Sequence, residues 1–192
     1  MDKKRDWIVL LIGGPSGTGK SSIAYGLAAY YGISVLEIDD IGQALKAVTN
    51  RNILPDIHYW GTGINWKDIG AAGNVDWLIG VSKELAPSIK AIVNNHLESG
   101  VPVIIEGDFL SPELAASFDN PMVKSIFINE ADKSQIVNNY LNREGGSSQG
   151  FRAEISIAYG IWLSGECKRL KIPVLESRPW STAQGRAIEF LL

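Results

Sequence analysis

The residues of this chain with the clearest chemical meaning form a glycine-rich segment that ends in a lysine and a serine. Residues 14–21 read Gly-Pro-Ser-Gly-Thr-Gly-Lys-Ser and match the pattern G-x-x-x-x-G-K-S of a phosphate-binding loop. Glycines let successive backbone N–H groups of such a loop turn toward a di- or triphosphate. The segment follows the apolar run 7–12 and precedes a helical pattern, which is the context this motif needs. A glycine-rich turn without a ligand is the alternative, but it does not require Lys-Ser after the last glycine.

This loop predicts a nucleotide site with a metal ion. We expect Lys20 to reach the β- and γ-phosphates and the Ser21 hydroxyl to ligate Mg²⁺. The N-terminus of the following helix adds about half a positive charge at the same position. ATP and Mg²⁺ are the predicted cofactors. The predicted nucleotide-binding residues of the loop are Gly14, Ser16, Gly17, Thr18, Gly19, Lys20, Ser21 and Ser22.

Carboxylates that follow two other apolar runs are the candidates for directing the reaction. Asp39 follows the run 33–38, and two roles are open to it: accepting a proton from an attacking hydroxyl, or holding Mg²⁺. Glu106 follows the run 101–105, and we expect it to orient the Mg²⁺ water shell. Asp108 could share that role or contact the substrate. A helix cap or a solvated loop is the alternative for each carboxylate.

Transfer of a phosphoryl group also requires positive charge on the moving phosphate, which a closing lid can supply. Arg143 and Arg152 flank the glycine- and serine-rich stretch 145–150. We therefore predict a small lid over about residues 142–153 with one or both arginines on the phosphates. Each arginine could equally be a solvated helix residue.

Two further segments contain candidate ligand contacts. Arg178 and Pro179 follow the last apolar run and precede Trp180, so a guanidinium or a ring could stack on the nucleotide base there. A helix-entry turn with a packing tryptophan is the alternative. His58 lies in an irregular segment, and a lone histidine is more often a structural hydrogen-bonding residue than a ligand. His58 is the candidate substrate contact of that segment.

The elements that must position these residues are read from alternating apolar runs and helical patterns. The predicted strands are 7–12, 33–38, 101–105, 123–128 and 172–176. Strands separated by helices predict an α/β fold with a parallel sheet covered by helices on both faces. Right-handed crossovers then bring the carboxyl ends of all strands to one edge, where ligands of such sheets bind.

The remaining pattern predicts one domain over residues 1–192, with an irregular insertion over about 50–74 for acceptor binding. A long helix is expected over 75–99, with a kink or a division at Pro87. Another helix is expected to start at Asp132 as its N-cap residue, and a capping box at Ser181 is expected to open the last helix.

Composition narrows the class of protein. The chain has 192 residues, a formal net charge of −3 and one cysteine, Cys167. It has no long basic block, so a nucleic-acid partner is not expected. Its apolar runs are too short for a membrane span, so no membrane partner is expected either, and a single cysteine fits a reducing compartment. We predict a cytoplasmic protein, either a monomer or a homodimer.

With these motifs in place, the chain resembles the small-molecule kinases of the P-loop class, and within them it is most similar to 2-phosphoglycerate kinase. Four stretches carry the resemblance: 12–24, 39–41, 54–58 and 104–112. The resemblance implies a sheet in strand order 2-3-1-4-5, use of ATP with Mg²⁺, and a hydroxyl group as acceptor. It also implies a functional role for His58.

One departure from the family pattern bears on the acceptor. Gly42 and Gln43 stand where the family tends to carry an arginine that suits an anionic acceptor. A 2-phosphoglycerate-like compound, a sugar, a hydroxy acid or an antibiotic therefore all stay open as the phosphate acceptor.

Two alternatives of another class also stay open. One is a nucleotide-dependent switch or ATPase that binds a protein partner. The D-x-x-G pattern at 39–42 favours it, and the lack of an Asn-Lys-x-Asp motif for guanine disfavours it. The other is a kinase with a macromolecular acceptor.

Overall fold

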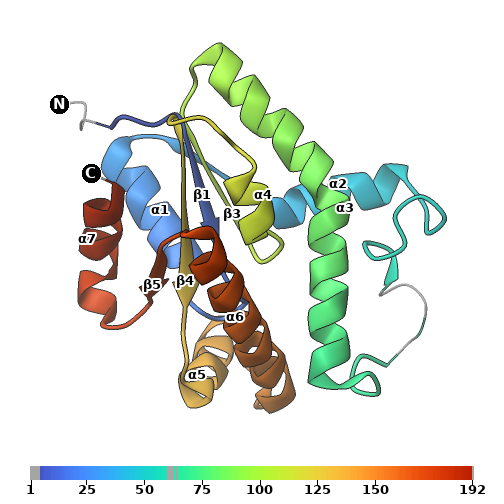
Figure 1. The fold of residues 1–192 in the computed structure, drawn as a ribbon. Coiled ribbons are helices and arrows are strands. Elements are labelled where there is room, and N and C mark those ends of the chain that lie inside the picture. The colour runs from blue at the N-terminus through green and yellow to red at the C-terminus, as the bar shows by residue number, and fades with distance from the viewer. Residues whose placement is uncertain (1–4, 60–62, 64, 192) are drawn as a thin grey trace.

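The computed structural model describes residues 5–59, 63 and 65–191. Helices and strands alternate through most of this part of the chain (Figure 1). In chain order they are β1 Val9–Gly13, α1 Lys20–Tyr31, β2 Ser34–Glu37, α2 Ile38–Val48, α3 Gly70–Ser99, β3 Val103–Gly107, α4 Pro112–Ala116, β4 Val123–Asn129, α5 Lys133–Glu144, α6 Gly150–Leu170, β5 Val174–Glu176 and α7 Trp180–Leu191.

The strands form one sheet in the order β2-β3-β1-β4-β5, and every neighbouring pair is parallel. The predicted α/β class and the strand order 2-3-1-4-5 are both confirmed. All residues of β1 and β3 are buried, because these two strands have neighbours on both sides and helices on both faces.

Alternating side chains of β1 divide the core into two layers. Val9 and Leu11 pack in the layer that holds α3, α4 and α6, while Leu10 and Ile12 pack in the layer that holds α1 and α7. Figure 1 shows these two groups of helices on opposite sides of the sheet. The two-sided burial fixes the sheet, and with it the edge where β1, β2 and β3 end.

The element boundaries differ from the prediction where chemistry is expected. Glu106 lies inside β3, opposite Glu37 of β2, rather than after the strand. Asp39 lies in the first turn of α2, because that helix begins directly after β2 at Ile38. Both carboxylates still reach the carboxyl edge of the sheet.

Helix α3 is continuous through Pro87 and changes direction about half way along its length (Figure 1), which matches the expected kink and excludes a division. The capping box expected at Ser181 was wrong, and the N-cap expected at Asp132 is confirmed. Helix α7 begins at Trp180, so Ser181 lies inside it rather than at its cap. Asp132 does cap α5 and accepts a hydrogen bond from the backbone N–H of Ser134 at 2.9 Å.

The predicted lid falls at the connection between α5 and α6, and the predicted insertion falls between α2 and α3. Residues 145–149 join α5 to α6, so the predicted lid includes the ends of both helices. The described residues between α2 and α3 form turns rather than long elements. None of the helices in the described part of the chain is long and apolar enough to span a bilayer.

Candidate active site

The loop between β1 and α1 depends on glycine at two close approaches. Gly14 has a φ angle of 145°, and a Cβ atom there would collide with the backbone oxygen of Ile128. Gly19 has a φ angle of 87°, and a Cβ atom there would collide with the Trp180 ring. Because only glycine adopts such angles readily and lacks the Cβ atom, these positions exclude other residues. The loop backbone therefore lies tightly against β4 and α7.

Thr18 stabilises the same loop from within. Its hydroxyl is buried and donates a hydrogen bond to the Pro15 carbonyl oxygen at 2.8 Å. Asn139 of α5 donates to the Gly17 carbonyl oxygen at 2.7 Å. These two bonds occupy carbonyl oxygens of the loop, which favours backbone N–H groups as the groups offered to an anion.

Lys20 is the first residue of α1 and lies at the centre of an acidic cluster. Its ammonium group forms an ion pair with Asp108. Burial by itself would lower the pKa of Lys20, but the carboxylates of Asp108, Glu106 and Asp39 outweigh burial and raise it. Lys20 is therefore charged at neutral pH. Since one cation faces several carboxylates, the cluster favours a second cation.

Asp39 has the electrostatic surroundings of a base. Burial, and then the neighbouring Asp108 carboxylate, raise the pKa of Asp39 even though Lys20 acts in the opposite direction. A carboxylate with a raised pKa accepts a proton more readily than an ordinary aspartate.

Glu106 lies deepest in the cluster. It is only 3% exposed, and its Oε2 atom has no hydrogen-bond partner in the described part of the chain. Burial raises the pKa of Glu106, while Lys20 and the Ser21 hydroxyl act to lower it. A buried carboxylate oxygen without a partner is destabilising unless a cation or an ordered water satisfies it.

Mg²⁺ prefers oxygen ligands, and the side chains of this cluster offer oxygen atoms. Among the described residues, no three His, Cys, Asp or Glu side chains are grouped so as to hold a metal ion on their own. In nucleotide sites, Mg²⁺ takes one or two carboxylates together with substrate phosphates and water. Ser21, Asp39 and Glu106 fit that demand, and the unpartnered oxygen of Glu106 is the observation that supports the fit.

The two predicted lid arginines converge on one carboxylate at the junction of α5 and α6. Arg152 donates to both Glu144 oxygens at 2.9 Å, and Arg143 pairs with the same group. Hydrogen bonds from Gln149, Arg143 and Arg152 lower the pKa of Glu144 to about 2. Arg152 also donates to Ser16 of the glycine loop at 3.3 Å. Glu144 thus balances two guanidinium groups that lie beside the phosphate-binding loop, as a phosphate group could.

Half of the predicted site residues meet around a single cavity of about 250 Å³, called here the phosphate cavity. It is lined by Ser16, Lys20, Ser21, Asp39, Glu106, Asp108, Arg143 and Arg152, and also by Glu37, Gly107 and Glu144. It joins a helix N-terminus, three basic side chains and several carboxylates. This arrangement suits a triphosphate that arrives with a divalent cation.

A second cavity, of about 390 Å³, shares Lys20, Ser21 and Arg143 with the phosphate cavity. Gly17, Gly19, Lys20, Ser21 and Ser22 line it from the loop, and Asn139, Asn142, Arg143 and Trp180 line it from α5 and α7. The two asparagines were not predicted. Their spacing of three residues, just before the lid, puts them on one face of α5 and was the available signal.

Arg178, Pro179 and His58 lie outside the phosphate cavity. Arg178 donates to both oxygens of the buried Glu130 at 2.7 and 2.8 Å, and with Pro179 it lines a separate pocket. His58 Nε2 lies 3.0 Å from the Thr49 hydroxyl oxygen. In the described part of the chain, His58 lines neither the phosphate cavity nor its neighbours.

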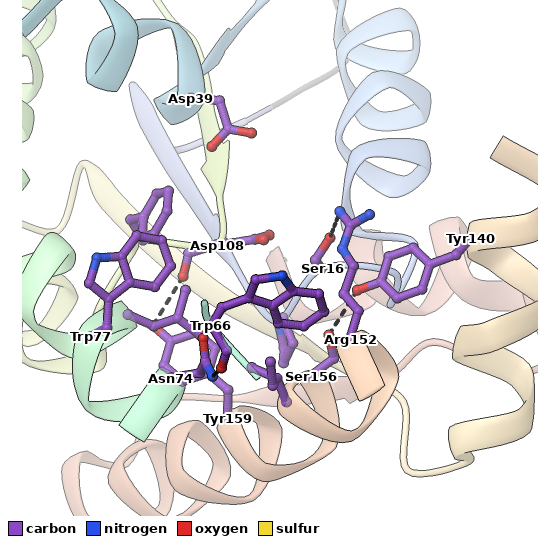
Figure 2. Close-up of a pocket in the computed structure, with 14 residues that line it drawn as sticks. Ser16, Asp39, Trp66, Asn74, Trp77, Asp108, Tyr140, Arg152, Ser156 and Tyr159 are labelled. Atoms are coloured by element: carbon purple, nitrogen blue, oxygen red, sulfur yellow. Dashed lines mark hydrogen bonds between the residues drawn. The ribbon is translucent and has the colours of Figure 1, made fainter. Parts of the chain in front are cut away.

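A third cavity, of about 300 Å³, opens next to the phosphate cavity and is called here the aromatic pocket (Figure 2). Ser16, Asp39, Asp108 and Arg152 line both cavities. The aromatic pocket is otherwise lined by rings and aliphatic groups: Pro15, Trp66, Trp77, Leu78, Phe109, Tyr140, Ile155 and Tyr159, together with Asn74 and Ser156. Sequence reasoning identified the segment 50–74 that holds Trp66, but it missed the rings, which come from α3, α5, α6 and the segment after β3.

Gly42 and Gln43 line a fourth cavity, which shares Asp39, Trp77 and Phe109 with the aromatic pocket. Lys46, one turn further along α2, lines the same cavity. The position where the family resemblance leads one to expect an arginine is thus close to Asp39, and Lys46 is the basic side chain that faces it.

The comparisons with known proteins were made by sequence and by structure. No family model matches the chain. A 2-phosphoglycerate kinase of Pyrococcus furiosus is 26% identical over 88% of this chain and 59% of its own length. A 2-phosphoglycerate kinase of Pyrococcus horikoshii is 34% identical over 55% of this chain and 36% of its own length. The chain thus spans less than two thirds of the curated relatives that it matches.

Solved structures agree on the fold. A gluconokinase from Sinorhizobium meliloti superposes with a TM-score of 0.55 at 18% identity, over 98% of this chain and 93% of that one. A shikimate kinase from Acinetobacter baumannii in complex with shikimate gives a TM-score of 0.56 at 14% identity, over 97% and 92%. The chain has the fold of the P-loop kinases, and its resemblance to 2-phosphoglycerate kinase is confirmed as a sequence relationship.

Proposed function

We propose that this chain is an ATP-dependent phosphotransferase that moves the γ-phosphate to a hydroxyl group of a small molecule. One observation carries the proposal: the phosphate cavity and the aromatic pocket share Asp39, Asp108, Ser16 and Arg152. A hydroxyl group bound in the pocket therefore faces the end of a triphosphate bound on the loop. The relatives named as kinases of 2-phosphoglycerate support the same reaction class.

In this proposal the carboxylates have different tasks. Asp39 lines the aromatic pocket and has a raised pKa, so it accepts the proton from the attacking hydroxyl. Glu106 lines the phosphate cavity but not the aromatic pocket, which favours a role beside the phosphates. Asp108 pairs with Lys20 and orients that ammonium group. The raised pKa of Asp39 favours the role of base, and holding Mg²⁺ stays the second role open to it.

The basic groups stabilise the charge that develops on the transferring phosphoryl group. Lys20 lies at the loop, and Arg143 and Arg152 approach from the lid side of the same cavity. When the phosphates bind, they take over the contacts that Glu144 makes with both arginines. Ser21, Asp39 and Glu106 are the residues that would hold Mg²⁺, which when bound neutralises phosphate charge.

We assign the nucleotide base to the cavity between Arg143 and Trp180, where a guanidinium group and an indole ring face the loop. Arg178 and Pro179 remain predicted base contacts at a neighbouring position. ATP as the nucleotide, a cytoplasmic location, and a monomeric or homodimeric state also remain predictions.

The test measures ADP release from Mg-ATP with 2-phosphoglycerate and with a panel of unphosphorylated sugars, hydroxy acids and alcohols. The variant Lys20→Ala is the blank. Release stimulated by an acceptor, with formation of its phosphate ester and dependence on Lys20, supports the proposal. If Mg-ATP binds to the wild-type protein no better than to Lys20→Ala, the proposed function is wrong.

A further inference from the structure

The inference concerns the acceptor and rests on the proposed function. We propose that the acceptor is an uncharged hydroxyl compound with an aromatic or otherwise apolar ring, not a phosphorylated or carboxylated metabolite. The walls of the aromatic pocket carry this inference through three properties: their chemistry, the way their polar atoms are used, and their charge.

The walls offer ring faces to a ligand. Trp66, Trp77, Phe109, Tyr140 and Tyr159 line a pocket of about 300 Å³, which is the size of a site for a small ligand. The rings are braced by one another: Trp77 and Phe109 meet edge to face with centroids 6.1 Å apart. In Figure 2, Trp66 and Trp77 face the space between the two shared aspartates and α6. Stacking on such faces favours a flat or apolar ligand body.

The polar atoms of these rings are already engaged within the protein. Trp77 Nε1 donates to the Asp56 carbonyl oxygen at 2.8 Å. The Tyr159 hydroxyl donates to the Asp108 carbonyl oxygen at 3.1 Å, and the Tyr140 hydroxyl lies 2.9 Å from the Ser156 hydroxyl. These rings are therefore held by their polar ends and present mainly carbon to the pocket. A sugar with many hydroxyl groups would find few partners on them.

The charge of the lining disfavours an anionic acceptor. Among the described residues that line the aromatic pocket, Arg152 is the basic side chain, while Asp39 and Asp108 are acidic. Arg152 is bound to Glu144 and lies 4.2 Å from the Tyr140 ring centroid, turned toward the phosphate cavity. A carboxylate or phosphate on the acceptor would thus be desolvated next to Asp39, while Arg152 is already paired with Glu144 and Asp108 with Lys20.

The Asp39 carboxylate remains in the pocket to bind one hydroxyl group of the acceptor. The Asp39 carboxylate can accept the hydroxyl proton where the pocket meets the phosphate cavity. The acceptor therefore needs one hydroxyl at that end and an apolar ring behind it.

Lys46 could allow an anionic acceptor to bind instead of an uncharged one. It lines the cavity that shares Trp77 and Phe109 with the aromatic pocket, and an anionic acceptor could reach it by lying across those rings. The experiment has to separate this anion-binding route from the ring-binding route.

The experiment compares four acceptors that differ in two features. The compounds are 3-phenylpropane-1,2-diol with a ring and no charge, 3-phenyllactate with a ring and a carboxylate, glycerol with neither, and 2-phosphoglycerate with charge and no ring. For each compound, kcat and KM are determined from ADP release and phosphate-ester formation, with Lys20→Ala as the blank. We expect the uncharged ring compound to have the highest kcat/KM, at least about tenfold above the other three, as one bound ring is worth.

Two variants report on the rings. Phe109→Leu and Trp66→Leu should each raise KM for the ring compound by about 3- to 10-fold and change the KM for ATP little. Phe190→Leu, an exposed ring on α7 outside the site, is the matched control and should change neither value. If one pocket variant fails to fold, the other still measures how much the pocket rings contribute to acceptor binding. Equal loss of activity toward all acceptors would contradict ring recognition.

The results separate the inference from the proposed function. Preference for 2-phosphoglycerate, or for 3-phenyllactate in a manner lost in Lys46→Ala, overturns the inference and leaves the kinase proposal standing. Failure of all four compounds to react also overturns it. In that case, Lys20-dependent binding of Mg-ATP decides separately whether the proposed function survives.

Discussion

Replacing Glu106 with glutamine should make the protein more stable and less active. Glu106 is 3% exposed, and its Oε2 atom has no hydrogen-bond partner in the described part of the chain. Its pKa is raised chiefly by burial, against the influence of Lys20, so the folded state disfavours the charged form. Glutamine keeps the shape, removes the charge, and can donate its amide hydrogens to the neighbouring carboxylates.

The expected gain in stability can be estimated from the cost of burying the Glu106 carboxylate without a hydrogen-bond partner on Oε2. A buried polar group without a partner costs about 1–3 kcal/mol. Glutamine recovers part of this, so we expect a gain of about 1–2 kcal/mol at pH 7. In a chain of this length, about 1 kcal/mol shifts the melting temperature by about 2–4 °C, so Tm should rise by about 2–8 °C. Activity should fall by about 10- to 100-fold, as expected when a residue that orients a metal site is lost.

The gain in stability from Glu106→Gln should depend on pH. A carboxyl group whose folded pKa is raised above its ordinary value of 4.5 stabilises the fold at low pH, and that contribution is lost as pH rises through the folded value. The stability difference between Glu106→Gln and wild type should therefore be largest at pH 7 and above and shrink as the pH falls toward 4.5.

The assay is thermal and urea unfolding from pH 4 to 8, with steady-state kinetics on the same samples. Glu98→Gln, an exposed glutamate of α3, is the matched control and should change stability by less than about 0.5 kcal/mol. A Glu106→Gln protein that is less stable than wild type at pH 7, or a difference that grows toward acid pH, would refute the reasoning.

Three further predictions concern the basic residues. Lys20→Ala should lower turnover by at least ~10²–10³, the scale for losing one preorganised charge-stabilising group, and near-wild-type kcat would remove Lys20 from the mechanism. Arg143→Ala and Arg152→Ala should each reduce kcat more than they weaken ATP binding measured by calorimetry, and unchanged kinetics in both would make the lid assignment wrong. Arg178→Ala should lower the melting temperature, because the buried Glu130 loses two hydrogen bonds; unchanged stability would contradict this structural role.

Much of the fold could be predicted from local pattern. Apolar runs of β1 and β3 are long enough to identify buried parallel strands, and helical patterns between them require crossovers of one hand. The exact ends of elements could not be predicted: α3 begins at Gly70 rather than at Val75, and α7 begins before Ser181. Those boundaries depend on packing against the sheet, which local propensity does not contain.

The phosphate cavity was more accessible to prediction than the aromatic pocket. Lys20, Asp39, Glu106 and Asp108 each lie within two residues of an element boundary at one edge of a parallel sheet, so topology alone brings them together. The rings of the pocket come from elements far apart in the chain and have no shared spacing. The family resemblance indicated His58, which contacts Thr49 and does not line the phosphate cavity, so its functional role stays a prediction.

The sequence by itself determined the phosphate-binding loop and the carboxylates at the sheet edge, while the strand order was implied by the family resemblance. The sequence could do so because the loop is a local motif and because parallel strands align their ends. Only the tertiary structure decided that Arg178 holds Glu130, that Glu144 balances both lid arginines, and that a pocket of rings adjoins Asp39. These contacts join residues from separate elements, and their partners are fixed by how helices pack on the sheet rather than by any spacing along the chain.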